Sequence, residues 1–541
     1  MTDMRAAEPA SSRRLPDPRP RAASGLGSTG ARDPLRAREQ WERPGIDVAS
    51  EETSPAAPLF AAVDIGASSG RVIVGNIGSG EVSLEVVHRF PNGVMEHPAP
   101  EHGSLHWDLD GLFDQVLVGL AAAAEYAATV VGQIASIGID TWAVDYGLID
   151  ADGAMAGPPF SYRDGRGAKQ VVSVHERISP EQLYQTTGLQ HLPFNTIYQL
   201  AAEQAAGQDL TARHALLIPD LIAFKLTGVR RAESTNASTT GLFDAVAGEW
   251  ATEFLAALGL PAELFPPLVE PGDTIGTLRP EIAAHTGLPA TTTVVAVGSH
   301  DTASAVAAVP AAGKNFAYIS SGTWSLVGVE LAIPVLSEAS RLANFTNERG
   351  VDGTIRYLRN VGGLWLLSES MRSWDEAAAS AGTVAPSLTE LLVAAAAEPP
   401  GGPRIDVDSQ EFIAPGGMPG RVRAAVHAKG GALDTRPAAV VRCILESLAA
   451  AYAATVREAA ELSGQAVEVI HIVGGGSQNE LLCQLTANAT GLPVEAGPVE
   501  ATALGNVLIQ ARAAGAAPAT RGELRAVVAA SHQCVRYLPI S

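Results

Sequence analysis

The segment GSHDTASAV contains residue types suited to acid–base chemistry. His300, Asp301 and Thr302 lie there between an apolar run, which predicts a strand, and small residues that predict a helix. Asp301 could simply cap that helix. It could also be a general base that accepts a hydroxyl proton during phosphoryl transfer, which typically contributes about 10²–10⁴-fold in rate. The residues alone leave both interpretations open.

Two short turns rich in small residues are suited to binding phosphate. The first is DIGASSGR, residues 64–71, and the second is SSGT, residues 320–323. Each lies between β-rich runs and presents backbone N–H groups that can hold phosphate oxygens, although either turn alone could be an ordinary hairpin. Neither is a Walker A loop, because neither contains Gly-Lys-Ser/Thr and a strand follows. Facing each other, the turns could grip one polyphosphate, with Asp64 orienting a hydrated Mg²⁺.

Glycines and aromatic residues point to the two ends of a ligand site. Gly474, Gly475 and Gly476 follow an apolar run and let another molecule approach the backbone closely. A purine could lie there, and Asn479 follows in the first turn of the expected helix; the alternative is a tight strand-to-helix connection. The segments GIDTWAVDYG, FSYRDGR and LRNVGGLW place polar groups beside aromatic faces, a mixture suited to sugar recognition.

The elements that must position these residues occur twice. Folded patterning begins at Leu59 with short β-rich runs, and a second set begins near Gly313. AVDIGASSGRVIVGNI and AYISSGTWSLVGVEL are similar hairpins that each open a mixed α/β unit, which predicts duplicated domains facing each other across a cleft. We expect an N-terminal domain over 58–310 and a C-terminal domain over 311–541, with a long core helix over 436–464.

Composition excludes several classes of protein. The 541 residues are 46% hydrophobic and 18% charged, and the net charge is −21, which disfavours a broad electrostatic grip on nucleic acid or an anionic membrane. No uninterrupted apolar run approaches the ~18–20 residues of a spanning helix. Three widely spaced cysteines, Cys443, Cys483 and Cys534, predict small buried thiols in a reducing cytoplasm. Residues 1–57 are rich in Arg, Pro, Ser and Gly, which predicts a disordered N-terminal extension.

Taken together, these motifs resemble the FGGY family of carbohydrate kinases from about Leu59 to Ala514. The resemblance is carried by VDIGASSGRV, YRDGR, SHDTASAV, ISSGTWSL, NVGGLWLL, HIVGGGSQN and AGPVEATALGN. GIDTWAVDYG and GLQHLPFNT are similar to the branch of the family that acts on rhamnulose. The resemblance implies an α/β fold of two actin-like, ribonuclease-H-like domains with a ligand cleft between them. It also implies ATP-dependent phosphorylation of the 1-hydroxyl of L-rhamnulose in L-rhamnose catabolism, with Mg²⁺.

The resemblance also implies roles for single residues, with Asp301 as the catalytic base. Two positions depart from the family pattern: Ala143 stands where a glycine often touches the sugar, and Ser368 where a glutamine often contacts nucleotide. The resemblance thus gives Ala143, His300, Thr302 and Asn360 as substrate-binding residues. Trp142 and Arg163 are added because aromatic and polar side chains together suit sugar recognition. The nucleotide-binding set is Ala67, Ser68, Ser69, Gly70, Arg71, Thr323, Ser368 and Gly475, to which Asn479 is added, and Asp64 is the candidate metal ligand.

Three other functions remain open at this stage. The same chemistry could act on another ketose, such as xylulose or fuculose. The cleft could belong to an actin-like ATPase without a sugar acceptor, or to a sugar-binding regulator without activity. For the main hypothesis we expect a small ketose and ATP as partners, no nucleic acid or membrane, a monomer or small homo-oligomer, and a cytoplasmic location.

Overall fold

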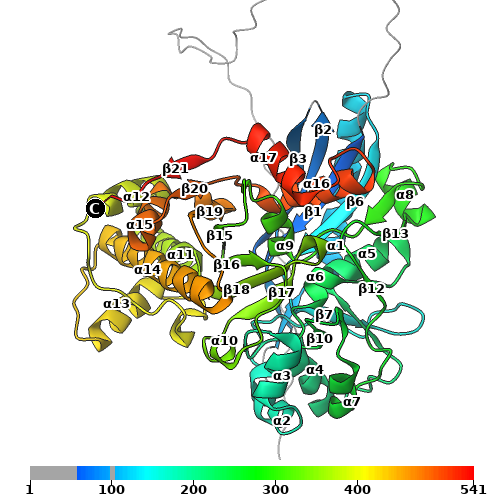
Figure 1. The fold of residues 1–541 in the computed structure, drawn as a ribbon, viewed down its shortest axis with the longest axis horizontal. Coiled ribbons are helices and arrows are strands. Elements are labelled where there is room, and N and C mark those ends of the chain that lie inside the picture. The colour runs from blue at the N-terminus through cyan, green and yellow to red at the C-terminus, as the bar shows by residue number, and fades with distance from the viewer. Residues whose placement is uncertain (1–57, 79, 98–103, 541) are drawn as a thin grey trace, which may run out of the picture. The chain divides into compact units, whose positions relative to one another are not determined.

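The computed structural model describes residues 58–78, 80–97 and 104–540. The extension predicted over residues 1–57 lies outside this described part. The described chain forms mixed α/β structure with two large sheets, one of six strands and one of seven (Figure 1).

Both sheets have the same plan. The strand orders are β13-β14-β6-β1-β2-β3 and β17-β18-β16-β15-β19-β20-β21. In each, an antiparallel hairpin (β1–β2 or β15–β16) continues into a third antiparallel strand, while a parallel strand (β6 or β19) pairs with the other side of the first. The two similar hairpins of the sequence therefore open two sheets of related topology. The strands are β1 (Leu59–Ile65), β2 (Ser69–Gly78), β3 (Glu81–Pro91), β6 (Ile134–Thr141), β13 (Thr274–Thr277), β14 (Thr293–Val295), β15 (Phe316–Ser321), β16 (Trp324–Leu331), β17 (Thr346–Arg349), β18 (Ile355–Gly362), β19 (Val469–Val473), β20 (Val494–Ala496) and β21 (Val535–Tyr537).

Strand β1 lies at the centre of the N-terminal sheet. All of its residues, LFAAVDI, are buried, as expected for a strand covered on both faces. Its register pairs Asp64 with Arg71 on β2 and with Asp140 on β6. Three charged side chains therefore meet at the carboxyl end of this strand.

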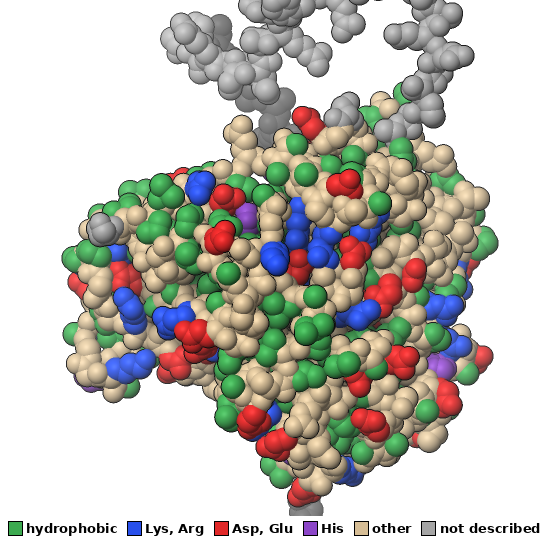
Figure 2. Space-filling model, in the orientation of Figure 1, with side chains coloured by type: hydrophobic (Ala, Val, Ile, Leu, Met, Phe, Trp, Pro, Cys, Tyr) green, Lys and Arg blue, Asp and Glu red, His purple; other side chains and the backbone are tan. Residues whose placement is uncertain are grey.

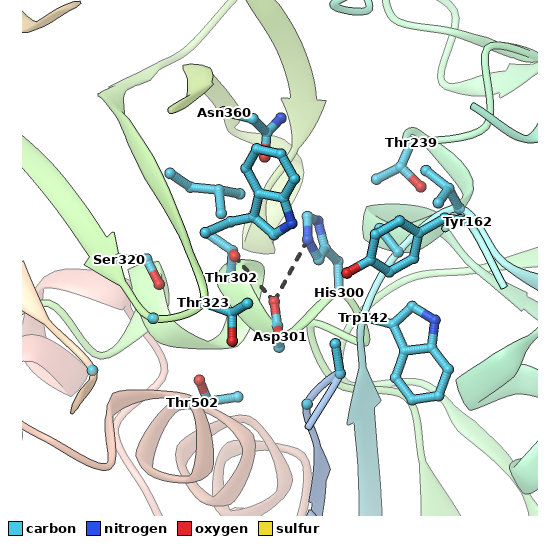
Figure 3. Close-up of a pocket in the computed structure, with 18 of the residues that line it drawn as sticks. Trp142, Tyr162, Thr239, His300, Asp301, Thr302, Ser320, Thr323, Asn360 and Thr502 are labelled. Atoms are coloured by element: carbon cyan, nitrogen blue, oxygen red, sulfur yellow. Dashed lines mark hydrogen bonds and ion pairs between the residues drawn. The ribbon is translucent and has the colours of Figure 1, made fainter. Parts of the chain in front are cut away.

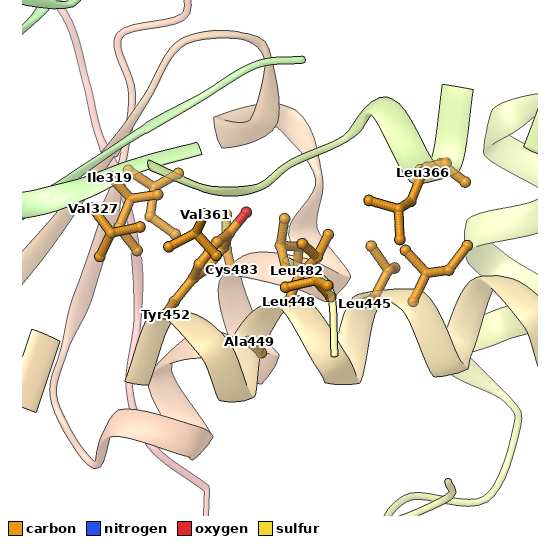
Figure 4. Packing of buried hydrophobic residues seen from close by; sticks show 14 of the residues in the cluster. Ile319, Val327, Val361, Leu366, Leu445, Leu448, Ala449, Tyr452, Leu482 and Cys483 are labelled. Atoms are coloured by element: carbon orange, nitrogen blue, oxygen red, sulfur yellow. The ribbon is translucent and has the colours of Figure 1, made fainter. Parts of the chain in front are cut away.

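The C-terminal sheet packs on α14 (Pro437–Ser463), the helix expected over residues 436–464. Figure 4 shows Tyr452 of this helix beside Val327 and Val361 of the sheet, and Leu448 beside Leu482. Among the described helices α14 is long and apolar enough to cross a membrane, but 78% of its most apolar window is buried inside the fold. Its length and apolar character are thus explained by the core that it forms.

Helix α16 (Ala501–Ala513), close to the end of the chain, packs on strands of the N-terminal sheet and on α9 (Asp301–Ala307). Figure 1 shows α16 beside β1 and beside α9. The contact with α9 is close because Gly505 has no side chain: a Cβ there would lie 1.8 Å from the carbonyl oxygen of Ser304. Apolar residues of both sheets, including Phe60 and Tyr318, complete this core between the domains.

The cysteine prediction was correct for Cys443 and Cys483, which are buried, but wrong for Cys534, which is only partly buried. Cys534 directly precedes β21, the outermost strand of the C-terminal sheet, so less of the protein covers it.

The remaining elements are α1 (Leu109–Thr129), α2 (Val171–His175), α3 (Pro180–Thr187), α4 (Thr196–Ala205), α5 (Ile218–Thr227), α6 (Ser234–Ala237), α7 (Thr252–Leu258), α8 (Pro280–Thr286), α10 (Glu338–Leu342), α11 (Trp365–Ala381), α12 (Leu388–Ala396), α13 (Met418–Ala428), α15 (Glu480–Thr490), α17 (Arg521–Ser531), β4 (Val94–His97), β5 (Ser104–Trp107), β7 (Tyr146–Ile149), β8 (His214–Leu217), β9 (Ala232–Glu233), β10 (Phe243–Asp244), β11 (Glu249–Trp250) and β12 (Leu268–Val269).

Candidate active site

A cavity of about 320 Å³ lies between the two sheets and is lined by residues of both. Figure 3 shows Asp301 pointing into it, with Thr323 and Ser320 on one side and Trp142 and Tyr162 on the other. The cavity brings together most of the residues singled out in the sequence. Those that line it are Asp64, Ala67, Ser68, Ser69, Arg71, Trp142, Ala143, His300, Asp301, Thr302, Thr323, Asn360 and Gly475.

Asp301 is the first residue of α9, and His300 occupies the capping position without a side-chain capping bond. The Asp301 carboxylate accepts a hydrogen bond from Thr302 Oγ1 at 3.0 Å, and its Oδ1 lies 3.5 Å from His300 Nε2. Its side chain is 34% exposed, so it remains open to a ligand in the cavity. Burial raises its pKa; His300 opposes that shift and the carboxylate of Asp64 adds to it. A raised pKa makes an aspartate a better proton acceptor.

The loop before Asp301 is held by a buried glutamate. Glu233 Oε2 accepts hydrogen bonds from Ser299 N at 3.0 Å, from Ser299 Oγ at 2.6 Å and from Thr235 Oγ1 at 2.6 Å. Thr141 N, at the end of β6, donates to Ser299 O at 2.9 Å. These bonds fix the backbone from which His300 and Asp301 project.

The first small-residue turn ends in an ion-paired arginine. Arg71 donates to Asp64 Oδ2 at 2.7 Å through Nη2 and lies 2.9 Å from Glu500 Oε2 through Nη1. Two carboxylates therefore already neutralise this guanidinium, and the turn offers mainly backbone groups and serine hydroxyls to an anion. Gly70 lies within β2, where a Cβ would collide with the ring of Phe90, so its role is to let the strands approach.

The glycine run forms the tight connection considered for it in the sequence, and one of its residues also lines the cavity. Gly474 has a positive φ of 81°, and a Cβ at Gly476 would lie 2.0 Å from Ser321 Oγ. These two glycines therefore allow a tight connection packed against β15. A Cβ at Gly475 would meet nothing within 4 Å, and this residue lines the cavity.

Acidic side chains are gathered where a cation would be needed. Asp140 Oδ1 is buried without a hydrogen-bond partner among the described residues, and burial, together with the charge of Asp64, raises the pKa of Asp140 well above its ordinary value. No group of three His, Cys, Asp or Glu residues in the described chain forms a complete metal cage. Mg²⁺ needs no such cage, because it keeps several waters and uses one or two carboxylates together with substrate phosphates. The residues present fit a hydrated Mg²⁺ held partly by a nucleotide.

The other end of the cavity has aromatic walls fixed by Asp145. This buried carboxylate accepts hydrogen bonds from Trp107 Nε1 at 2.6 Å, Trp142 Nε1 at 3.0 Å, Tyr162 N at 3.0 Å and Gln199 Nε2 at 2.9 Å. Burial raises the pKa of Asp145 to about 6, against the lowering effect of these four donors. Such an arrangement holds flat apolar faces at defined angles, as sugar binding requires.

Four residues of the predicted site do not line this cavity, Gly70 of β2 and the three that follow. The Arg163 guanidinium lies 4.8 Å from the ring centroid of Trp365 and 5.1 Å from that of Tyr162, beside a separate small pocket. Asn479 caps α15 by accepting a hydrogen bond from Leu482 N at 3.0 Å. Ser368 lies in α11, away from the cavity lining.

Sequence comparison identifies the family. The N-terminal domain of the FGGY family of carbohydrate kinases matches residues 59–308, and its C-terminal domain matches residues 317–514. The chain belongs to the FGGY family of carbohydrate kinases. The family predicted from the motifs is thereby confirmed.

Individual relatives agree with this assignment of an FGGY kinase. The chain is 41% identical to the rhamnulokinase of Bacteroides thetaiotaomicron over 482 residues, which cover 89% of this chain and 96% of the relative. It is 37% identical to the rhamnulokinase of Bacillus subtilis, and the match covers 84% of this chain and 90% of the relative.

Solved structures agree in fold. The gluconate kinase of Lactobacillus acidophilus superposes with a TM-score of 0.70 at 17% identity, covering 90% of this chain and 94% of that one. The xylulose kinase of the same organism superposes with a TM-score of 0.69 at 17% identity, covering 89% of this chain and 94% of that one. The predicted fold of two actin-like domains is confirmed.

Several lining residues of this FGGY kinase were not predicted. Gln190 and Asn195 lie in the segment GLQHLPFNT, which carried the resemblance without any assigned contact. Gln190 Oε1 accepts hydrogen bonds from Asn360 N at 3.0 Å and Asn360 Nδ2 at 2.9 Å. Glu348 and Thr239 also line the cavity. They stand in segments without any motif, and only the fold brings them to the site.

Proposed function

We propose that this FGGY kinase transfers the γ-phosphoryl group of ATP to the 1-hydroxyl of L-rhamnulose, producing L-rhamnulose 1-phosphate and ADP. The observation that carries the chemistry is the Asp301 carboxylate, which opens into a cavity lined by both small-residue turns. The choice of sugar is supported by the rhamnulokinases that are 37–41% identical over more than four-fifths of the chain.

Asp301 acts as the general base. It accepts the proton of the 1-hydroxyl while the sugar oxygen bonds to the γ-phosphorus and the bond from that phosphorus to the bridging oxygen of ADP breaks. Asp301 then releases the proton to solvent. Most of the acceleration in such reactions comes from positioning and from stabilising charge on the phosphoryl oxygens, which is the role of the two turns that contain Ser68 and Thr323.

Asp64 would hold a hydrated Mg²⁺ beside the nucleotide phosphates. When bound, the metal neutralises phosphate charge during the transfer. The chain's own contribution is to orient Asp64, which the two hydrogen bonds from Arg71 to its Oδ2 do at 3.0 and 2.7 Å.

The sugar end of the cavity fits a deoxy ketose. Trp142 and Tyr162 supply flat faces, and Asn360, held by Gln190, supplies a polar group. Leu189, Leu192 and Phe194 add an apolar wall. L-rhamnulose carries a methyl group at carbon 6, which such a wall accommodates at lower desolvation cost than a hydroxymethyl group.

The domains have separate roles in this proposal. Residues 58–310 bind the sugar and the phosphates and supply the base, and residues 311–541 bind the nucleotide, with Gly475 beside the adenosine. The enzyme works in the cytoplasm as a monomer or small homo-oligomer. The charge distribution does not favour binding to nucleic acid. Basic and acidic side chains are interspersed on the face shown in Figure 2, and the net charge is −21.

A coupled assay of ADP release tests the proposal. Purified protein is supplied with ATP, Mg²⁺ and L-rhamnulose, L-fuculose, D-xylulose or no sugar. We expect turnover with L-rhamnulose that exceeds turnover with the other sugars, and little ADP release without sugar. Preference for another ketose would reassign the substrate, and equal ADP release without sugar would contradict a sugar kinase.

A further inference from the structure

A buried ion pair of the C-terminal domain reaches the segment that contains Asp301. Glu348 on β17 and Arg356 on β18 are cross-strand partners, and their side chains are 4% and 0% exposed. Arg356 Nη1 lies 2.9 Å from Glu348 Oε2, and Arg356 Nε donates to Arg349 O at 3.1 Å. The pair is thus held rigidly in its own sheet.

Both members of the pair contact one nitrogen of His300. Arg356 Nη2 and Glu348 Oε2 each lie 3.1 Å from His300 Nδ1, while His300 Nε2 lies 3.5 Å from Asp301 Oδ1. The contact joins the two domains, because His300 belongs to the N-terminal family match and the ion pair to the C-terminal one.

The protonation chemistry of His300 follows from these neighbours. An arginine can only donate, so when Nδ1 accepts from Arg356 the proton of a neutral imidazole must be on Nε2. When the imidazole is charged, Nδ1–H faces the Glu348 carboxylate and Nε2 is again protonated. In both of these states the Nε2–H group faces Asp301, and His300 needs no movement to pass between them. The other neutral tautomer, protonated on Nδ1, is disfavoured because it would turn the Nε2 lone pair toward the Asp301 carboxylate.

We propose that Glu348 and Arg356 are positioning residues for phosphoryl transfer, which fix His300 so that its Nε2–H group supports the carboxylate of Asp301. The proposal rests on the proposed function, since it takes Asp301 as the base. Glu348 has the charge that this role requires: burial alone would raise its pKa, but Arg356 and His300 bring the pKa below its ordinary value.

The charged groups around Asp301 define what a pH experiment can report. Asp64 at the end of β1 and Asp140 on β6 face it, Arg71 on β2 is paired with Asp64, and His300 precedes it in the chain. Removing Glu348 and Arg356 together changes none of these groups and leaves the net charge unchanged. His300 is the main charged group that shifts the pKa of Asp301, and neither Glu348 nor Arg356 is among the main causes, so we expect a shift in that pKa to come through His300.

The test uses the full chain with the double substitution Glu348→Met/Arg356→Met. Replacing both members of a buried pair with apolar residues of similar size avoids an uncompensated charge, so the protein is expected to fold. The matched control is Glu446→Met/Arg442→Met, which removes another buried Arg–Glu pair, 2.7 Å apart within α14. Melting temperature, kcat, KM for ATP and the pH profile of kcat/KM are measured for both, with L-rhamnulose as acceptor.

We expect the Glu348/Arg356 variant to lose about 10–100-fold in kcat, the effect typical of residues that orient a functional side chain. Its KM for ATP stays unchanged, and the acidic limb of its pH profile moves to higher pH because the Asp301 anion loses support. The control keeps its kcat and its profile. The proposal is overturned if the Glu348/Arg356 variant folds with unaltered kcat and pH profile, or if both variants lose activity only in proportion to lost folding. Absence of wild-type turnover with L-rhamnulose would instead reject the proposed function.

Discussion

Substituting alanine for Gly505 tests how tightly the catalytic helix is located. The new Cβ would lie 1.8 Å from Ser304 O and 2.5 Å from Ser304 C, whereas ordinary contacts are near ~3.5 Å. Helices α16 and α9 must therefore separate by on the order of 1.5 Å, because the obstacle is backbone and cannot rotate away. Overpacking usually costs about 1–3 kcal/mol, and we expect this site to reach the upper end of that range.

The displacement would also reach the chemistry. Ser304 lies three positions after Asp301 in the same short helix, so moving α9 moves the base, and a misplacement of about 1 Å can cost about 10²-fold in rate. We therefore expect Gly505→Ala to melt roughly 6–12 °C lower and to lose about 100-fold in kcat, as measured by calorimetry and ADP release.

The matched control is Gly420→Ala in α13. A Cβ there meets nothing within 4 Å, so the substitution should be neutral or stabilise by about 0.4–1 kcal/mol. If Gly505→Ala melts and turns over like the wild type, the helix contact does not fix Asp301 and the reasoning is refuted.

Two further predictions concern the carboxylates. Burial and the charge of Asp64 raise the pKa of Asp301 above its ordinary value of 3.8, while His300 opposes the shift. Because the reaction needs the ionised base, kcat/KM should fall as the pH drops through this pKa, at a higher pH than for an exposed aspartate. A value of kcat/KM that does not change at acidic pH would contradict this prediction. Asp145→Asn replaces the charged acceptor of Trp107, Trp142 and Tyr162 by an amide oxygen and turns an N–H₂ group toward the donor Gln199 Nε2, so we expect a loss of about 1–3 kcal/mol in stability and a higher KM for the sugar with KM for ATP unchanged. Equal effects on both KM values would show that Asp145 does not act on the sugar end alone.

The sequence was informative where chemistry is local. The duplicated hairpins predicted two related sheets, because a Gly/Ser/Thr turn between β-rich runs specifies its own geometry. The long apolar stripe around Leu445 and Tyr452 predicted α14 for the same reason. The segment around Asp301 likewise carried a recognisable strand-to-helix pattern.

The sequence was least informative where contacts are distant. Gln190 meets Asn360 across 170 positions of the chain, and Glu348 meets His300 only because β17 lies against the cleft. No local pattern encodes such pairs. Arg163 shows the converse: its place among aromatic residues predicted a sugar contact, whereas its guanidinium stacks on Trp365 from the other domain. Its role in binding stays a prediction.

The central claim is that Asp301 takes the proton of the sugar hydroxyl, and Asp301→Asn tests it most directly. The amide has nearly the same size but is not basic, so the fold and nucleotide binding should persist. The measurement is ADP release at saturating ATP and L-rhamnulose, with ATP affinity determined by calorimetry. We expect kcat to fall by about 10²–10⁴-fold with ATP affinity nearly unchanged; turnover close to that of the wild type would contradict the account.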